Sequence, residues 1–234
     1  MQKTIVGLAL VAAMGAAHAA PSEEVTFAGR VSTLGVGIES STQFWDQVQL
    51  RVQANFAQFG IEWGSDWLPY QREAQMITAG AFVDVLPIRW LRLSAGVYLN
   101  KSRIHLDQQG ADIYEVGNAL YEGAPDFKLD GELGFRSFAP YLGVAFGNPF
   151  ATASPLSFSV DLGLMGAGKP SAQFDARGTV TPVDQYGNPT GPAVDAATDP
   201  DFRYDLRREK DKVANDGEIF RVYPVIGFSV AYRF

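Results

Sequence analysis

The chain has 234 residues and a formal net charge of −7, which argues against nucleic acid as a binding partner. Apolar residues make up 47%, which excludes a disordered chain, and the absence of cysteine excludes a disulfide framework or a thiol site. Only 19% of the residues are charged, which is low for a soluble protein and fits an exported membrane protein, although a secreted β-sandwich shares this composition.

The first 19 residues have the features of a secretory signal peptide. Lys3 supplies the positive start, and the apolar run from Ile5 to Ala17 is too short to span a membrane as a helix. Ala17 and Ala19 fit the small-x-small rule for cleavage. We therefore expect residues 1–19 to be removed and residues 20–234 to form one domain. No later apolar run reaches the roughly 18 residues of a spanning helix, so membrane insertion of the mature chain would use strands.

Eight segments of the mature chain show the period-two alternation of β-strands. The clearest is the third, in which an apolar face that includes Leu50 alternates with a polar face that includes Arg51. In the sixth segment Pro140 leaves the faces unassigned, because a bulge there would exchange them. The segments span about 26–31, 34–40, 47–61, 72–86, 91–106, 128–147, 156–165 and 220–234.

Short and long connections alternate between these segments. The short ones lie near 41–46, 87–90 and 148–155, and the long ones near 62–71, 107–127 and 169–219. Outer-membrane barrels have short periplasmic turns and longer outer loops. The sequence therefore predicts an all-β fold: an eight-stranded antiparallel transmembrane β-barrel in a Gram-negative outer membrane, with both chain ends in the periplasm. The turn near Ser32 and Thr33 would be an unusually small outer loop.

Aromatic residues support this prediction from both ends of the strands. Trp45 and Trp90 fall at short turns, whereas Trp63 and Trp67 fall at the opposite end, which predicts two aromatic belts at the membrane interfaces. The last strand ends on an aromatic residue, so we expect it to be the segment that the barrel-assembly machinery recognises. Its alternating apolar residues are Phe228, Val230, Tyr232 and Phe234.

The last long loop, about 169–219, contains a helix candidate. Asp199 can cap a helix that begins with Pro200, and Gly217 can end it, which predicts a short helix over about 201–216. Its mixed charges favour a solvated helix with i,i+4 ion pairs. A lid or constriction over the barrel mouth is the alternative.

If lipid covers the apolar faces, the opposite faces line the barrel interior. Buried charges of both signs need partners or water, so a closed ion-pair network that plugs the barrel and a narrow polar path for small solutes are both open. The candidate lumen residues are Glu39, Gln49, Arg51, Gln53, Asn55, Asp84, Arg92, Tyr98, Asp161, Arg221, Tyr223 and Arg233.

One outer loop is acidic and has no lysine or arginine among its acidic residues. Such a mouth would concentrate cationic solutes, although acidic loops also bind divalent ions beside lipopolysaccharide or simply keep a surface soluble. The residues concerned are Asp107, Asp112, Glu115, Glu122 and Asp126.

Several runs resemble a family of small proteobacterial outer-membrane barrels. They are 33–39 (TLGVGIE), 139–143 (APYLG), 161–163 (DLG) with 168–170 (GKP), and 222–225 (VYPV) leading into the terminal Tyr-Arg-Phe. The chain resembles the ornithine-uptake, carbapenem-susceptibility porin family over most of its mature length. The resemblance implies an eight-stranded barrel. It does not imply ornithine as the solute, because no binding residue of the family maps onto this sequence.

Three functions are compatible with these features. The first is a narrow porin-like channel for small polar solutes, with cationic amino acids as candidates. The second is a non-conducting structural or adhesion barrel that acts through its outer loops. The third, least favoured, is a lipid-modifying barrel enzyme that would use His105, although the nearby Ser102 would point to the opposite face. The sequence shows no metal or cofactor motif, so we expect that the protein binds no metal or cofactor and has no enzymatic activity. We expect outer-membrane lipid and lipopolysaccharide as its partners.

Overall fold

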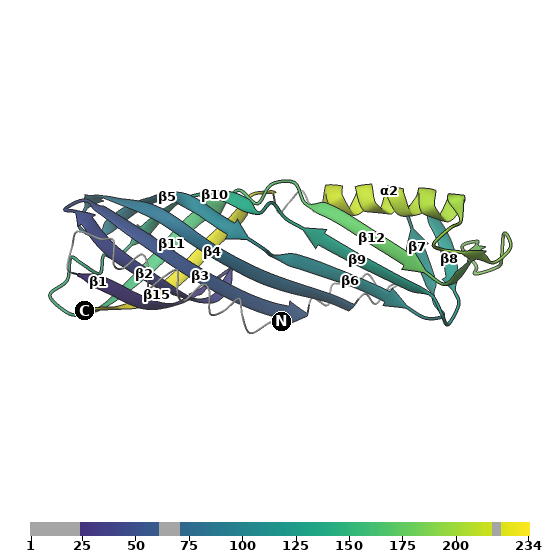
Figure 1. Cartoon of the computed structure of the whole chain (residues 1–234), viewed down its shortest axis with the longest axis horizontal. Helices are drawn as coiled ribbons and strands as arrows, with labels where there is room; N and C mark the ends of the chain where they lie inside the picture. Colours follow the sequence, from purple (N-terminus) through teal and green to yellow (C-terminus); the bar gives the residue numbers. More distant parts are fainter. Residues whose placement is uncertain (1–23, 61–70, 217–220) are drawn as a thin grey trace.

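The computed structural model describes residues 24–60, 71–216 and 221–234, which form a closed barrel and an extension that continues from one of its ends (Figure 1). Each barrel strand pairs antiparallel with the next, and β1 pairs with β15, so the sheet closes on itself. The predicted eight-stranded barrel is therefore confirmed. Its strands are β1 (Val25–Ser32), β2 (Gly35–Trp45), β3 (Val48–Gly60), β4 (Gln71–Ile88), β5 (Leu91–Asn100), β10 (Phe138–Phe146), β11 (Leu156–Met165) and β15 (Tyr223–Arg233).

The barrel is apolar outside and polar inside. Along β3, Gln49, Arg51 and Gln53 are buried, whereas Leu50 and Phe56 are 41% and 46% exposed on the outer surface. The same alternation runs through the neighbouring strands, so that a continuous belt of large apolar side chains surrounds the barrel. A belt of this extent would be covered by lipid, as in other transmembrane barrels.

In β10 the alternation is regular on both sides of Pro140. Ala139 and Tyr141 are buried, whereas Pro140 and Leu142 face outward. No bulge exchanges the faces there. The irregularity lies at residues 135–137, where the predicted sixth segment breaks into two strands.

At the end of the barrel that carries the short turns, two tryptophans project outward. Trp45 is 66% exposed, and Trp90 stacks on Phe146 with ring centroids 6.0 Å apart. The carboxyl-terminal Phe234 lies at the same end, where its ring meets Phe27 edge-on at 5.8 Å. The predicted signal peptide, Trp63 and Trp67 lie outside the described residues.

The first outer turn folds into the barrel mouth. Leu34, in the turn between β1 and β2, is fully buried, and the Thr33 side chain donates a hydrogen bond to the Pro224 carbonyl at 2.9 Å. Gly35 has a φ of 103°, and a Cβ at this position would lie 2.2 Å from the Phe56 carbonyl oxygen. Glycine is therefore required for this tight turn.

The extension continues the barrel sheet outward. The first residues of β4 pair with β6, which pairs with β9 and through it with β12. The predicted segments 91–106 and 128–147 are each divided in two, because the chain changes partners at the barrel rim. The elements of the extension are β6 (Arg103–Gln109), β7 (Ile113–Val116), β8 (Ala119–Gly123), β9 (Lys128–Gly134), β12 (Ser171–Arg177), β13 (Thr179–Val183), β14 (Val194–Asp195) and α2 (Pro200–Asp216).

The predicted helix is confirmed and lies in the extension. Asp199 Oδ1 accepts a hydrogen bond from the Phe202 amide at 2.9 Å, which is the expected cap. The helix packs against β12 and β7 (Figure 1), so it covers the extension and not the inside of the barrel. Within the described ranges, no helix has both the length and the apolar character that a membrane span requires.

The extension has a hydrophobic core of its own. Phe202 is fully buried between Tyr121 and Phe127, with ring centroids 5.0 and 6.3 Å away. The Tyr121 hydroxyl donates to Asp205 at 2.8 Å, and burial together with this carboxylate raises the pKa of Tyr121. The extension is thus a folded unit and not a set of separate loops.

We predict that Phe202→Ala unfolds the extension while the barrel stays closed. The change removes a fully buried ring and should cost the extension about 3–5 kcal/mol. Limited proteolysis of the folded protein should release the extension faster, with the heat-dependent gel shift of the barrel unchanged. Tyr204→Ala, at a 57% exposed position of the same helix, is the control and should leave the cleavage rate unchanged. Equal protection in both variants would contradict a separate core.

Candidate functional site

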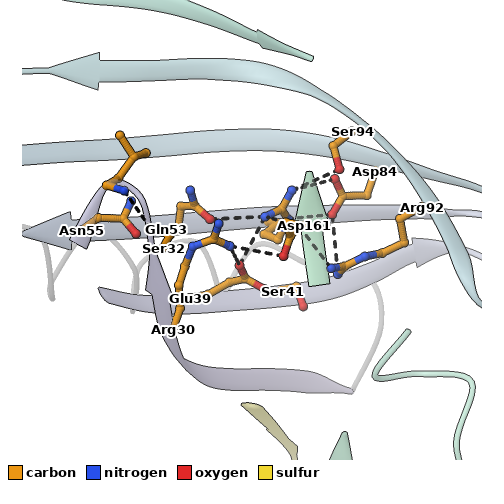
Figure 2. A network of polar contacts seen from close by, with 12 residues as sticks. Arg30, Ser32, Glu39, Ser41, Gln53, Asn55, Asp84, Arg92, Ser94 and Asp161 are labelled. Atoms are coloured by element: carbon orange, nitrogen blue, oxygen red, sulfur yellow. Dashed lines mark hydrogen bonds and ion pairs between the residues drawn. The ribbon is translucent and has the colours of Figure 1, made fainter. Parts of the chain in front are cut away.

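Six charged side chains meet inside the barrel, and we call them the charged cluster. Each comes from a different strand, and around the barrel from β1 to β5 the sign alternates from one strand to the next. Figure 2 shows the labelled members turned toward one another across the lumen. The cluster consists of Arg30 (β1), Glu39 (β2), Arg51 (β3), Asp84 (β4), Arg92 (β5) and Asp161 (β11).

Arg51 lies at the centre of the charged cluster. Its Nε is 2.7 Å from Asp84 Oδ2, and its Nη1 is 3.2 Å from Glu39 Oε2 and 3.5 Å from Asp161 Oδ1. Three carboxylates from three strands therefore share one guanidinium. The planar guanidinium suits this role because its donors point in several fixed directions.

Arg30 and Arg92 complete the charge balance. Arg30 Nη1 is 3.0 Å from Glu39 Oε2, and Arg92 Nη2 is 3.6 Å from Asp161 Oδ1. All six side chains are at most 5% exposed. Isolated buried charges are costly, so the equal number of positive and negative groups is what allows the cluster to be buried.

Neutral polar side chains extend the network along the lumen. Gln49 donates to Asn148 at 2.8 Å, Asn55 donates to Thr78 at 3.1 Å, and Gln53 donates to the Tyr98 hydroxyl. Several buried atoms, among them Arg92 Nε and Gln49 Oε1, have no hydrogen-bond partner in the part of the chain that the structure describes. Buried polar atoms of this kind are normally hydrated.

Toward the outer end of the lumen lies an aromatic plug, formed by Phe82, Tyr98 and Tyr141. The three ring centroids are 5.0 to 5.5 Å apart in edge-to-face contacts. The Arg51 guanidinium lies 4.7 Å from the Phe82 centroid, which connects the plug to the charged cluster. Leu34 and Met165, both fully buried, pack against the plug at the barrel mouth.

Inward-facing glycines make room for the plug. A Cβ on Gly143 or Gly163 would lie 2.4 or 2.3 Å from the Tyr141 hydroxyl oxygen. The ring can therefore cross the lumen only because these two strand positions have no side chain. The charged cluster and the plug fill the lumen at two successive levels, which agrees with the narrow interior of eight-stranded barrels.

The structure places most of the predicted lumen residues in this network, but not all of them. Tyr223 is half-buried at the outer end, where its hydroxyl donates to the Thr33 carbonyl at 2.8 Å. Arg233 lies at the opposite rim beside Glu24, at 3.3 Å. Arg221 is exposed at the outer rim, because β15 begins at Tyr223 and the alternation does not reach it. The buried residues are Glu39, Gln49, Arg51, Gln53, Asn55, Asp84, Arg92, Tyr98 and Asp161.

Arg30 is a member of the charged cluster that the sequence prediction omitted. The signal for it was present, since Thr26, Ala28 and Arg30 alternate with Phe27 and Val31 along β1. Phe82 and Tyr141 were also omitted as lumen candidates. Apolar and aromatic residues on an inward face indicate a plug only when their neighbours across the barrel are known.

The five acidic outer-loop candidates are dispersed over the extension and do not gather at the barrel mouth. Asp107, Asp112, Glu115, Glu122 and Asp126 are all exposed. Glu115 forms an ion pair with Lys212 of α2 at 3.1 Å, and Asp126 Oδ1 accepts from the Thr179 amide at 3.3 Å. Helix α2 thus brings a positive charge to a region that has none in the local sequence.

Ser102 and His105 do not form a nucleophile–base pair. Ser102 is buried in the break between β5 and β6, and no described residue forms a hydrogen bond with its Oγ. His105 lies on β6 opposite Glu73 and Glu132 of the adjacent strands. Among residues 24–60, 71–216 and 221–234, no group of three or more His, Asp or Glu side chains is arranged to hold a metal ion.

We predict that Arg51→Met destabilises the barrel strongly. The change leaves three buried carboxylates against two cations, and breaking a buried pair in this way costs about 3–5 kcal/mol. Arg51→Met combined with Asp84→Leu restores the charge balance and should cost less than Arg51→Met alone. The measurement is urea unfolding of the protein in lipid vesicles, followed by the heat-dependent gel shift.

Arg103→Met is the matched control for this series. Arg103 pairs with Glu132 at 2.8 Å, but its side chain is 55% exposed, and such pairs contribute at most about 1 kcal/mol. Similar losses for Arg51→Met and Arg103→Met would show that the charged cluster does not stabilise the barrel.

Comparison with known proteins gives the fold an independent reference. No protein-family model and no curated protein matches the sequence. The solved structure of CarO from Acinetobacter baumannii is 17% identical with a TM-score of 0.54, over 89% of this chain and 97% of that chain. The structure of Acinetobacter baumannii CarO2 is also 17% identical, with a TM-score of 0.56 over 90% and 98%. At this identity the similarity shows a shared fold, so the predicted resemblance to the carbapenem-susceptibility porins is confirmed for the eight-stranded barrel.

Proposed function

We propose that this protein is a bacterial outer-membrane barrel that is closed to solutes in the described state and holds a folded extension outside the membrane. The observation that carries the proposal is the filling of the lumen at two levels by the charged cluster and the aromatic plug. This corresponds to a non-conducting barrel that acts through its outer part.

The closed lumen has a clear physical basis. A solute that passed the charged cluster would have to separate ion pairs such as Arg51–Asp84, at 2.7 Å, in a region that is almost fully buried. Separated buried charges cost several kcal/mol, so the cluster resists opening. Above it, the rings of Tyr98 and Tyr141 and the buried Leu34 form an apolar layer, and such constrictions exclude water.

Location in the outer membrane is supported by three separate features. The N-terminal sequence has the pattern of a signal peptide, the barrel carries an apolar outer belt, and Phe234, which follows the last strand, lies beside the rim aromatics. The barrel fold that the chain shares with CarO agrees with this location. Outer-membrane lipid and the barrel-assembly machinery would be its first partners.

Passage of small polar solutes, including cationic amino acids, is the second candidate function. It is favoured by the buried Nε atoms of Arg30 and Arg92, which have no hydrogen-bond partner among the described residues, because such atoms can donate hydrogen bonds to a passing solute. Passage would require the Tyr141 ring to leave its glycine-lined position.

Solute flux distinguishes the two functions. We expect the refolded mature protein in liposomes to admit ornithine, arginine, glutamate and a neutral sugar no faster than empty liposomes do. Tyr141→Ala removes a ring from the plug and should raise the flux. Tyr114→Ala in the extension is the control and should not raise it, while the heat-dependent gel shift confirms folding in every sample.

Faster entry of the two basic amino acids through the unchanged protein would overturn the closed barrel and support a channel. No flux through either variant would show that the charged cluster alone is sufficient to close the lumen.

A further inference from the structure

A basic pocket lies on the outer surface where the barrel meets the extension. Its volume is about 500 Å³, and its positive side chains are Arg136, Lys169 and Arg221. These residues are exposed and lie at the level where the barrel strands end. We call this feature the rim pocket.

The backbone holds the three basic residues together although they are far apart in the sequence. Arg136 lies two residues before β10, Lys169 follows the end of β11, and Arg221 lies two residues before β15. The Arg136 amide donates to the Ala167 carbonyl at 3.1 Å, and the Gly168 amide donates to the Arg221 carbonyl at 3.1 Å. Gly168, with a φ of 73°, makes the turn that allows this close approach. The rim pocket is therefore a product of the fold.

The rim pocket carries an excess of positive charge. Among the described residues that line it, the one carboxylate, Glu132, already forms two hydrogen bonds with Arg103, at 2.8 and 2.9 Å. Lys169 Nζ also donates a hydrogen bond to the Asn215 side chain at 3.2 Å. Because the whole chain has a net charge of −7, this positive site is a local exception that favours an anion.

An apolar groove lies below the rim pocket on the same three strands. Its volume is about 600 Å³, and its outward-facing lining includes Leu142, Leu162, Leu164 and Ile226 of β10, β11 and β15. These four side chains are 69%, 40%, 56% and 53% exposed. We call it the lipid-face groove.

The two features are adjacent along the chain. Leu164 in the groove lies on β11, and Gly168 in the rim pocket follows it by four residues, just beyond the end of the strand at Met165. A headgroup in the rim pocket would therefore place its acyl chain along the lipid-face groove.

We propose that the outer rim binds a phosphorylated acyl lipid, with a phosphate in the rim pocket and an acyl chain in the lipid-face groove. Arginine suits a phosphate because its donors can bind two oxygens at once. For an outer-membrane barrel, the outer-leaflet lipid of this chemistry is lipopolysaccharide, whose lipid A part carries both groups. The proposal assumes the outer-membrane location but does not depend on whether the lumen conducts.

The test is native mass spectrometry of the refolded mature protein in detergent with added bisphosphorylated lipid A. Arg136→Gln combined with Arg221→Gln should weaken binding by about tenfold or more, since each basic residue near an anionic headgroup contributes on the order of a fivefold change in affinity. Arg203→Gln combined with Arg207→Gln, on exposed positions of α2, makes the same change in net charge and should leave binding unchanged. Equal weakening in both double variants, or none in the first, would overturn the proposal.

Leu162→Trp tests the groove separately. The larger side chain fills the lipid-face groove from a position that already faces lipid, so folding should persist and lipid A binding should fall. Inorganic phosphate, added at the same concentration as the lipid, should compete poorly. If Leu162→Trp binds lipid A normally, or if inorganic phosphate displaces it, the rim pocket is a simple anion site and the lipid assignment fails.

Discussion

The ion pairs around Arg51 are the constraint on which the rest of the barrel depends. Each of the first five strands contributes one charge, and each charge needs the opposite charge of its neighbours at the same level. A one-residue slip in any strand turns its whole inward face outward. It would place an arginine or an aspartate in lipid, where an arginine at the membrane midplane costs about 2–4 kcal/mol, and would leave the remaining charges unbalanced. The charged cluster therefore selects the strand register as well as closing the lumen.

One continuous sheet forms both the barrel, whose outer face is suited to lipid, and the extension, whose outer face is suited to water. In the barrel the inward faces of strands such as β3 and β5 are largely polar and their outward faces are apolar. In β9, which continues β10 beyond the rim, Leu129 and Leu133 face inward, whereas Lys128 and Asp130 face out. The same side of the sheet faces inward in both parts. Its residues change from polar in the barrel to apolar in the extension, because the surroundings of the outer face change from lipid to water. The reversal occurs at the strand breaks near 101–102 and 135–137, where the outward apolar belt also ends.

The sequence was sufficient for the barrel because period-two alternation is a local property. The strand that contains Leu50 and Arg51 could be assigned to two faces from its own residues, and the helix that begins at Pro200 could be recognised from its cap. The breaks that divide the predicted segments could not be recognised from the sequence, since even-numbered residues face inward both in β5, as Tyr98 does, and in β6, as Ile104 does. Only the exchange of partner strands separates them, and pairing is not a local property.

The extension was missed for the same reason. Its strands β7, β8 and β13 are only four or five residues long, and β14 has two. Such runs are too short for alternation to be distinguished from loop sequence. Their stability comes from long-range packing around Phe127 and Phe202, which lie 75 positions apart in the chain. In the charged cluster, Arg51 and Asp84 could be placed by parity, whereas their mutual distance depended on a register that only the closed barrel supplies.

Closure removes the free strand edges of the barrel, but the extension sheet is open. Among the described strands, β12 pairs only with β9, so its other edge can accept a further strand. Free edges promote aggregation, and charged side chains along them are a common protection. Asp175 and Arg177 lie on the outward face of β12, and Arg177 is already paired with Asp130 at 3.2 Å. Crowded in a membrane, neighbouring copies of this protein would thus meet at a charged border that disfavours edge-to-edge sheet growth.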